Sequence, residues 1–182
     1  LLLNRQNKIV MKKILLFSAL FVMQFLFAQQ IDLTIRYSVS NSFFFFFAKP
    51  NFTQNNFTWG PSQISVLVPS SFPNQALLIT AHAGGSWGYN SIVYSSSSSP
   101  NFDFHGVSSN GQLTNLVANQ ELLVFSFLAP SGTCIDGLRL FTNGSDPDSN
   151  QPGMNGGDFQ NSIDNGTLAD IYNTNYNNTG TI

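Results

Sequence analysis

Cysteine, basic residues and helix-forming stretches are all scarce in this 182-residue chain. Cys134 is the only cysteine, so no disulfide can form within the chain, and we expect its thiol to be a small buried apolar group. Lysine and arginine together number seven, and four of these lie before residue 14. Residues that favour strands and turns are abundant instead. These absences exclude a disulfide framework and argue against a helical fold.

The N-terminal part has the order of a secretory signal peptide. Residues 11–13 are Met-Lys-Lys, and 14–27 is an apolar run interrupted only by one serine and one glutamine. Ala28 then offers a small residue for cleavage. The apolar run is shorter than the roughly 20 residues that span a bilayer, so an uncleaved anchor is the lesser alternative. We interpret 11–28 as a helical signal peptide and 1–10 as an upstream extension that is not part of the native protein.

Residues 29–182 form an acidic segment that is long enough for one domain with its own core. Its basic side chains are Arg36, Lys49 and Arg139, against nine acidic ones, which gives a formal net charge of −6. Proteins that bind nucleic acid need lysine and arginine to neutralise phosphates. The sequence therefore predicts no nucleic-acid partner, and it predicts no membrane span once the signal peptide is removed.

Short apolar or alternating segments, separated by turn signals, recur along the domain. Alternation of apolar and polar residues is typical of half-buried strands. Several such strands in succession indicate a sandwich of two sheets. We predict an all-β fold, an antiparallel β-sandwich of immunoglobulin-like or cohesin-like type, over residues 29–165. The expected strands are 31–37, 43–47, 63–68, 76–80, 91–94, 121–128 and 138–141.

Two segments depart from this simple pattern. Phe43–Phe47 is an unbroken phenylalanine run, so a strand there is either buried on both faces or partly exposed. From Thr142 onward, asparagine, aspartate, glycine and threonine dominate, which predicts a long polar loop region. Within it, residues 166–182 are expected to be a polar tail or the start of a linker, with a short helix over 168–172 as an alternative.

One motif resembles the nucleophile site of a serine hydrolase. Gly84–Gly88 reads G-G-S-W-G and matches G-x-S-x-G, with His82 and His105 nearby. That motif requires a helix after the serine, whereas the residues after Gly88 have strand character. A catalytic Ser86 is therefore a remote alternative, and a glycine-rich turn is the preferred interpretation.

Acidic and amide side chains alternate in the polar loop region. Asp146, Asp148 and Asn150 are spaced two residues apart, and Asp158 follows. Calcium takes six to eight oxygen ligands from such loops. The spacing lacks the glycine and the glutamate of an EF-hand loop. A calcium site and an ordered polar loop without metal both remain open, and the sequence implies no other cofactor.

Three aromatic residues are candidates for stacking on sugar rings. Trp59, Trp87 and Tyr89 all lie beside turn-rich segments. On a β-sandwich, such residues serve either as a ligand platform or as part of the core. Both interpretations remain open from the sequence.

Several longer motifs together resemble a known family. They are Ala48–Gly60 (AKPNFTQNNFTWG), Ala83–Trp87 (AGGSW), Asn115–Glu121 (NLVANQE) and Pro152–Phe159 (PGMNGGDF). They are similar to the N-terminal domain of secreted, cell-surface proteins of Bacteroidota that carry a C-terminal type IX secretion sorting domain. The resemblance implies a β-sandwich followed by a linker and that sorting domain, and it brings no catalytic residue. The strand of that family alternates polar and aromatic residues where this chain has Phe43–Phe47.

The sequence thus predicts a secreted or cell-surface module without catalytic activity, of adhesive or structural type, as the N-terminal part of a larger exported protein. Its expected partners are the secretion machinery and either a surface glycan or another cell-surface protein. A carbohydrate-binding module, stabilised by calcium, is the alternative.

Overall fold

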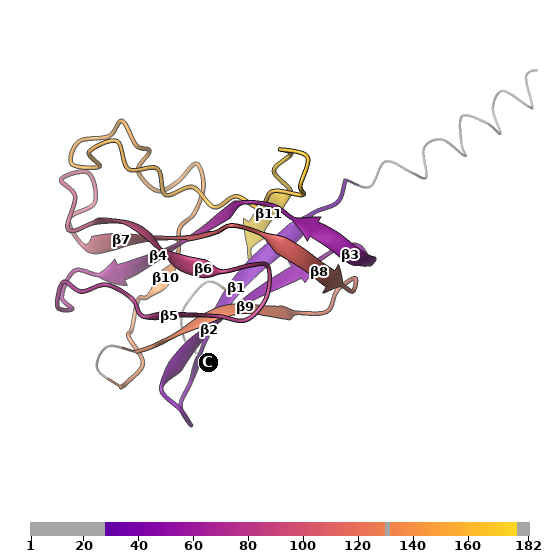
Figure 1. Ribbon diagram of the computed structural model, residues 1–182. Coiled ribbons are helices and arrows are strands. Elements are labelled where there is room, and N and C mark those ends of the chain that lie inside the picture. Colours follow the sequence, from indigo (N-terminus) through magenta and orange to yellow (C-terminus); the bar gives the residue numbers. More distant parts are fainter. Residues whose placement is uncertain (1–27, 130–131, 178–182) are drawn as a thin grey trace, which may run out of the picture.

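The computed structural model describes residues 28–129 and 132–177, and in these ranges the chain consists of strands and loops (Figure 1). No helix occurs there, and hence none with the length and apolar character to cross a bilayer. The predicted extension at 1–10 lies outside the described residues, as does all of the predicted signal peptide except Ala28. The prediction of an all-β fold is confirmed for the described part.

Three sheets make up the part of the fold that the structure describes. A five-stranded sheet has the order β11-β1-β2-β9-β5, a four-stranded sheet has the order β10-β4-β7-β6, and β3 pairs with β8 as a separate ribbon. All pairs are antiparallel except β1 with β11, which is parallel. The strands are β1 (Ile31–Ser38), β2 (Phe43–Pro50), β3 (Gln54–Trp59), β4 (Ser62–Pro69), β5 (Ile79–Ala81), β6 (Trp87–Val93), β7 (Phe102–Ser109), β8 (Gln112–Leu116), β9 (Leu122–Leu128), β10 (Arg139–Leu140) and β11 (Tyr172–Asn175).

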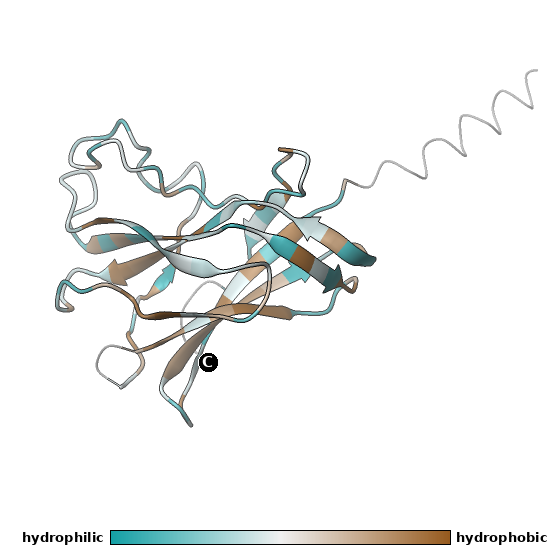
Figure 2. Ribbon diagram, in the orientation of Figure 1, coloured by the Kyte–Doolittle hydropathy of each residue, from teal (hydrophilic) through white to brown (hydrophobic). Residues whose placement is uncertain are grey.

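The two larger sheets share one hydrophobic core, which confirms the predicted β-sandwich. In the β1–β2 hairpin, Ile35 lies opposite Phe46, and both side chains are fully buried on the inner face. The β2 rings stack on those of β9, with ring-centroid distances of 5.3 Å for Phe44 and Phe127 and 4.2 Å for Phe46 and Phe125. Hydrophobic colouring accordingly runs along most of β2 and β9 (Figure 2).

A second, smaller core lies on the outer face of the four-stranded sheet. It forms because the polar loop region folds back over β4 and β7 instead of extending into solvent (Figure 1). Met154 and Phe159 of this loop are buried against Phe104 of β7, whose ring lies 5.5 Å from that of Phe159. The members of this core are Leu67, Val93, Phe104, Phe141, Met154 and Phe159. This sheet is therefore covered on both faces.

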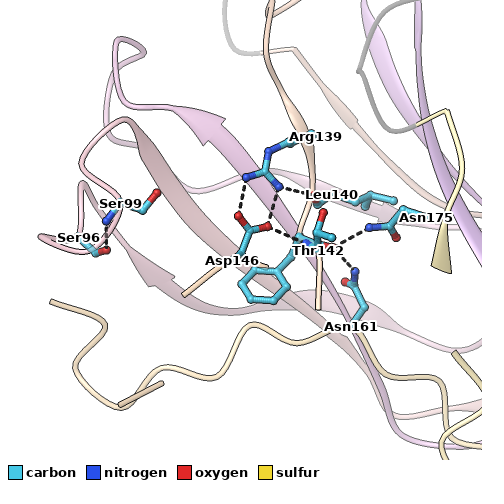
Figure 3. A network of polar contacts seen from close by, with 9 residues as sticks. Ser96, Ser99, Arg139, Leu140, Thr142, Asp146, Asn161 and Asn175 are labelled. Carbon is cyan, nitrogen blue, oxygen red and sulfur yellow. Dashed lines mark hydrogen bonds and ion pairs between the residues drawn. The ribbon is translucent and has the colours of Figure 1, made fainter. Parts of the chain in front are cut away.

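Amide side chains attach the loop layer to the sheet (Figure 3). Asn161 is 1% exposed, and its Oδ1 accepts a 2.8 Å hydrogen bond from the Ser65 backbone N–H while its Nδ2 donates to the Phe141 carbonyl at 2.7 Å. Asn143 in turn exchanges two 2.8 Å hydrogen bonds with the backbone N–H and C=O of Asn161. These side-chain amides add to the isolated backbone bridge that Ser162 of the loop forms with Gln63 of β4.

The C-terminal residues join the sandwich. Tyr172–Asn175, within the segment expected to be a polar tail, forms β11 and pairs with β1. The alternative of a helix over 168–172 is wrong, because Leu168 has φ of 63° and is 92% exposed in a turn. A left-handed residue at this position cannot continue an α-helix.

Cys134 is exposed, which corrects the expectation that its thiol is buried. It lies in the loop between β9 and β10, whose buried residues in the described part are Ala129, Ile135 and Leu138. These residues anchor the loop, whereas Cys134 faces solvent.

Candidate functional site

The outer face of the five-stranded sheet carries a row of apolar side chains. Because β2 alternates, the phenylalanines at odd positions point away from the core while Phe44 and Phe46 point into it. We call this row the phenylalanine face. Its members are Phe43, Phe45 and Phe47 of β2 with Leu123 and Leu128 of β9.

Register brings the five side chains of the phenylalanine face together. Phe43 lies opposite Leu128 and Phe47 opposite Leu123, and the Phe43 and Phe45 rings are 6.1 Å apart. None of the five belongs to either core, the three rings are half-buried, and Leu128 is 48% exposed. The sequence analysis did not select these residues as a site. The phenylalanine run could have indicated this site, because a strand of consecutive phenylalanines must place alternate rings on its outer face.

An open hollow extends this face beyond the end of β9. It measures about 160 Å³ and is lined mainly by Leu77, Leu78, Leu128 and Ala129. Leu78 is 77% exposed at its rim. The hollow and the phenylalanine face meet at Leu128, which belongs to both.

A charged border closes the other end of the phenylalanine face. Arg36 of β1 forms a paired hydrogen bond and ion pair with Glu121, and its guanidinium lies 5.1 Å from the Phe47 ring centroid. Tyr176 donates a 2.8 Å hydrogen bond to the same carboxylate and lies under the Lys49 ammonium at 4.5 Å. The bond from Arg36, with a smaller contribution from Tyr176, holds the pKa of Glu121 below its usual value. The border is therefore charged, and Arg36 and Glu121 within it form an ion pair, while Lys49 contacts the Tyr176 ring.

The two tryptophans lie in the core, which corrects their proposed role as sugar platforms. Trp59 is 1% exposed and Trp87 is 5% exposed, and their rings meet edge to face at 6.3 Å. Each indole N–H already has an acceptor inside the domain, the Ser62 hydroxyl at 3.1 Å and the Ala83 carbonyl at 2.7 Å. Neither ring presents a face on which a sugar could stack.

Tyr89, the third aromatic candidate, lies at the exposed edge strand β6. It is 37% exposed, and with Tyr94, 36% exposed, it flanks the imidazole of His105 at ring-centroid distances of 6.1 and 6.2 Å. His105 is 2% exposed and its Nδ1 has no hydrogen-bond partner. Burial lowers the pKa of His105 to about 4, so the imidazole is neutral at physiological pH. The edge therefore presents two neutral tyrosines to solvent.

The acidic loop uses its carboxylates for internal bonds. Asp146 accepts two 2.6 Å hydrogen bonds from Arg139 and a third from the Thr142 backbone N–H at 2.7 Å (Figure 3). Asp158 accepts from the backbone N–H of Gln160 at 3.0 Å. The remaining members of the predicted calcium set, Asp148 and Asn150, are exposed, and Asp148 lines an open polar hollow of about 290 Å³. Within the described ranges, no three His, Cys, Asp or Glu side chains are grouped so that they could hold a metal ion.

The G-x-S-x-G segment is a packing turn. Gly84 and Gly85 have φ of 75° and 111°, and a Cβ on Gly85 would lie 2.7 Å from the Gly111 backbone nitrogen. The residue after Ser86 begins strand β6, so the helix that a nucleophile elbow requires is absent. Of the nearby histidines, His82 instead bonds the Ser126 hydroxyl at 2.9 Å. The geometry does not assemble a Ser–His pair around Ser86.

Comparison of the chain with protein-family models, with curated proteins and with solved structures finds no match in any of the three.

Proposed function

We propose that this chain is a secreted or cell-surface binding module without catalytic activity, of the adhesive type, and that it binds through the phenylalanine face. One contrast carries the proposal. The outer face of the four-stranded sheet is covered by the domain's own loop layer, with Met154 and Phe159 buried in it. The outer face of the five-stranded sheet carries an apolar row that belongs to neither core. The rings of this row are half-buried and Leu128 is exposed, and contiguous apolar surface left open to solvent marks interaction sites.

Composition supports the extracellular part of the proposal. The apolar run before Ala28 has the features of an export signal, and residues 29–182 carry the net charge of −6 that disfavours nucleic acid. The proposed partners are the secretion machinery during export and a cell-surface molecule afterwards.

A bead-attachment assay tests the proposed function. Beads coated with the purified chain are expected to attach to cells of the organism that produces the protein. Phe45→Ser should reduce this attachment at least tenfold. Leu113→Ser is the matched control, since Leu113 is 61% exposed on the β3–β8 ribbon, away from this face. Equal attachment by both variants and the wild type would remove the phenylalanine face as the binding surface.

A second candidate function rests on Tyr89 and Tyr94. Tyr89 on the edge strand β6 and Tyr94 just after it are two partly exposed aromatic rings on which a sugar ring could stack. Because both tryptophans are buried, the carbohydrate-binding alternative depends on these two tyrosines. A glycan array probed with wild type and Tyr89→Ala, with calcium and with a chelator, tests it. Glycan binding that is lost in Tyr89→Ala supports this alternative, and an array without signal eliminates it.

A further inference from the structure

We infer that the partner bound by the phenylalanine face is a second copy of this chain, so that the module adheres to itself. The inference rests on the proposed function and names its partner. Three observations support it: the distribution of charge over the domain, the footprint of the face and the composition of the charged border.

The distribution of charge singles out this face for self-association. Two of the three basic residues in 29–182, Arg36 and Lys49, lie at its charged border. They are balanced by Asp32, directly opposite Lys49, and by Glu121, which is paired with Arg36. The face is therefore neutral overall, while the rest of the domain carries the whole charge of −6. Two copies repel each other everywhere else, and least when these faces meet.

The shape of the face suits a symmetric contact. β2 is the middle strand of the five-stranded sheet, so the apolar row runs along its centre with β1 on one side and β9 on the other. An isologous dimer requires one patch that is complementary to itself. An apolar row whose border carries equal numbers of positive and negative side chains meets that requirement, because neither copy presents an unbalanced charge to the other.

The size of the face predicts weak association. On the outer side of β1, Thr34 is fully buried and bonded to the Asn177 carbonyl, so β2 and β9 supply most of the open surface. Two strands at roughly 4.8 Å spacing and eight residues at roughly 3.4 Å rise give a footprint of about 260 Å² per copy. A stable interface buries about 800 Å² per partner. Isolated domains are thus expected to dimerise only at high micromolar concentration, whereas many copies displayed on a surface would bind through summed contacts.

Sedimentation velocity over a wide concentration range tests the inference. The wild-type chain is expected to shift from monomer toward dimer as concentration rises, and Phe45→Ser should move the midpoint at least tenfold upward while Leu113→Ser leaves it in place. Arg36→Glu is an independent variant that keeps the rings and makes the border acidic. It should weaken the dimer at low ionic strength, and added salt should restore part of the loss.

The outcomes separate the inference from the proposed function. A folded wild type that stays monomeric throughout, or a dimer unaffected by both Phe45→Ser and Arg36→Glu, overturns self-association. If attachment of beads to cells still depends on Phe45 in that case, the proposed function stands with a different partner. A Phe45-dependent dimer without any attachment supports self-association and removes adhesion to cells.

Discussion

His105 links the stability of the domain to pH through one buried imidazole. Its pKa falls from 6.5 to about 4 because burial disfavours the charged ring. Its neighbours Tyr89 and Tyr94 do not titrate in this range, because tyrosine has an ordinary pKa of about 10 and burial raises both pKa values further. Below pH 6.5 the unfolded chain takes up a proton at this position, whereas the folded chain does so only near pH 4. The free energy of unfolding should therefore fall by up to about 3 kcal/mol between these values, and stay constant above pH 6.5 as far as His105 is concerned.

Urea unfolding of the wild type and of His105→Gln, each at pH 7.5 and pH 5, measures this dependence. The wild type should lose more stability on acidification than the variant does. His82→Gln is the matched control, because His82 is exposed. If His105→Gln loses as much stability as the wild type, the imidazole is not the group responsible.

Neighbouring phenylalanines of β2 should differ sharply in their effect on stability. Phe46 is 1% exposed and stacks on Phe125, so Phe46→Ala is expected to cost about 3 to 5 kcal/mol. Phe45 lies on the outer face and outside both cores, so Phe45→Ala should cost about 1 kcal/mol or less. Urea unfolding of the two variants measures the difference. Equal losses would mean that the outer row is packed as tightly as the core.

At the scale of single elements, the attachment of the loop layer to β4 depends on Asn161. Asn161→Ala removes the acceptor of the Ser65 backbone N–H inside the domain, and a buried donor without a partner costs about 1 to 3 kcal/mol. The Phe141 carbonyl keeps its bond from Asn175 at 2.7 Å, which limits the loss. We expect a decrease of about 2 kcal/mol in urea unfolding. Asn173→Ala, at an exposed amide, should change stability by less than half of that.

Most apolar or alternating strands were predictable from the sequence, whereas β7 and the polar strands were not. The segments at 31–37, 63–68 and 121–128 were predicted within one or two residues of β1, β4 and β9. β3 and β8 were not predicted as strands, because asparagine, glutamine and threonine occupy their outer positions and such a composition is typical of loops. β11 was not predicted as a strand, because it is formed by pairing with β1. The paired residues are about 140 positions apart, and no local sequence pattern indicates such a pairing.

The candidate site was less predictable than the fold, because it depends on which rings end up inside. Trp59, Trp87 and Phe45 are equally aromatic in sequence, yet both tryptophans are buried and Phe45 faces outward. Strand parity and the packing of two sheets decide this, and neither is visible in a short motif. The role of the acidic loop was likewise ambiguous from the sequence. No local pattern indicated that Arg139 would donate hydrogen bonds to both carboxylate oxygens of Asp146.

For the molecule as a whole, the bonds of the acidic loop predict a stability that is independent of calcium. The Asp146 carboxylate accepts from Arg139 and from the Thr142 backbone, and its side chain is 10% exposed, so little of it is open to a metal. Thermal unfolding with calcium and with a chelator should give midpoints within about 2 °C. Asp146→Asn should lower both midpoints alike. A calcium-dependent rise of several degrees that vanishes in Asp146→Asn would establish a metal site in this loop.

The parallel pairing of β1 with β11 has a mechanical consequence (Figure 1). β1 begins at Ile31 and β11 ends at Asn175, at opposite ends of the same pair, which is joined by the bonds from Ile31 N–H to the Ile171 carbonyl and from Tyr176 N–H to the Leu33 carbonyl. Tension applied to the chain before Ile31 and after Asn175 pulls the two strands past each other lengthwise. These bonds then bear the load together in shear, rather than breaking one after another as they would if the strands were peeled apart.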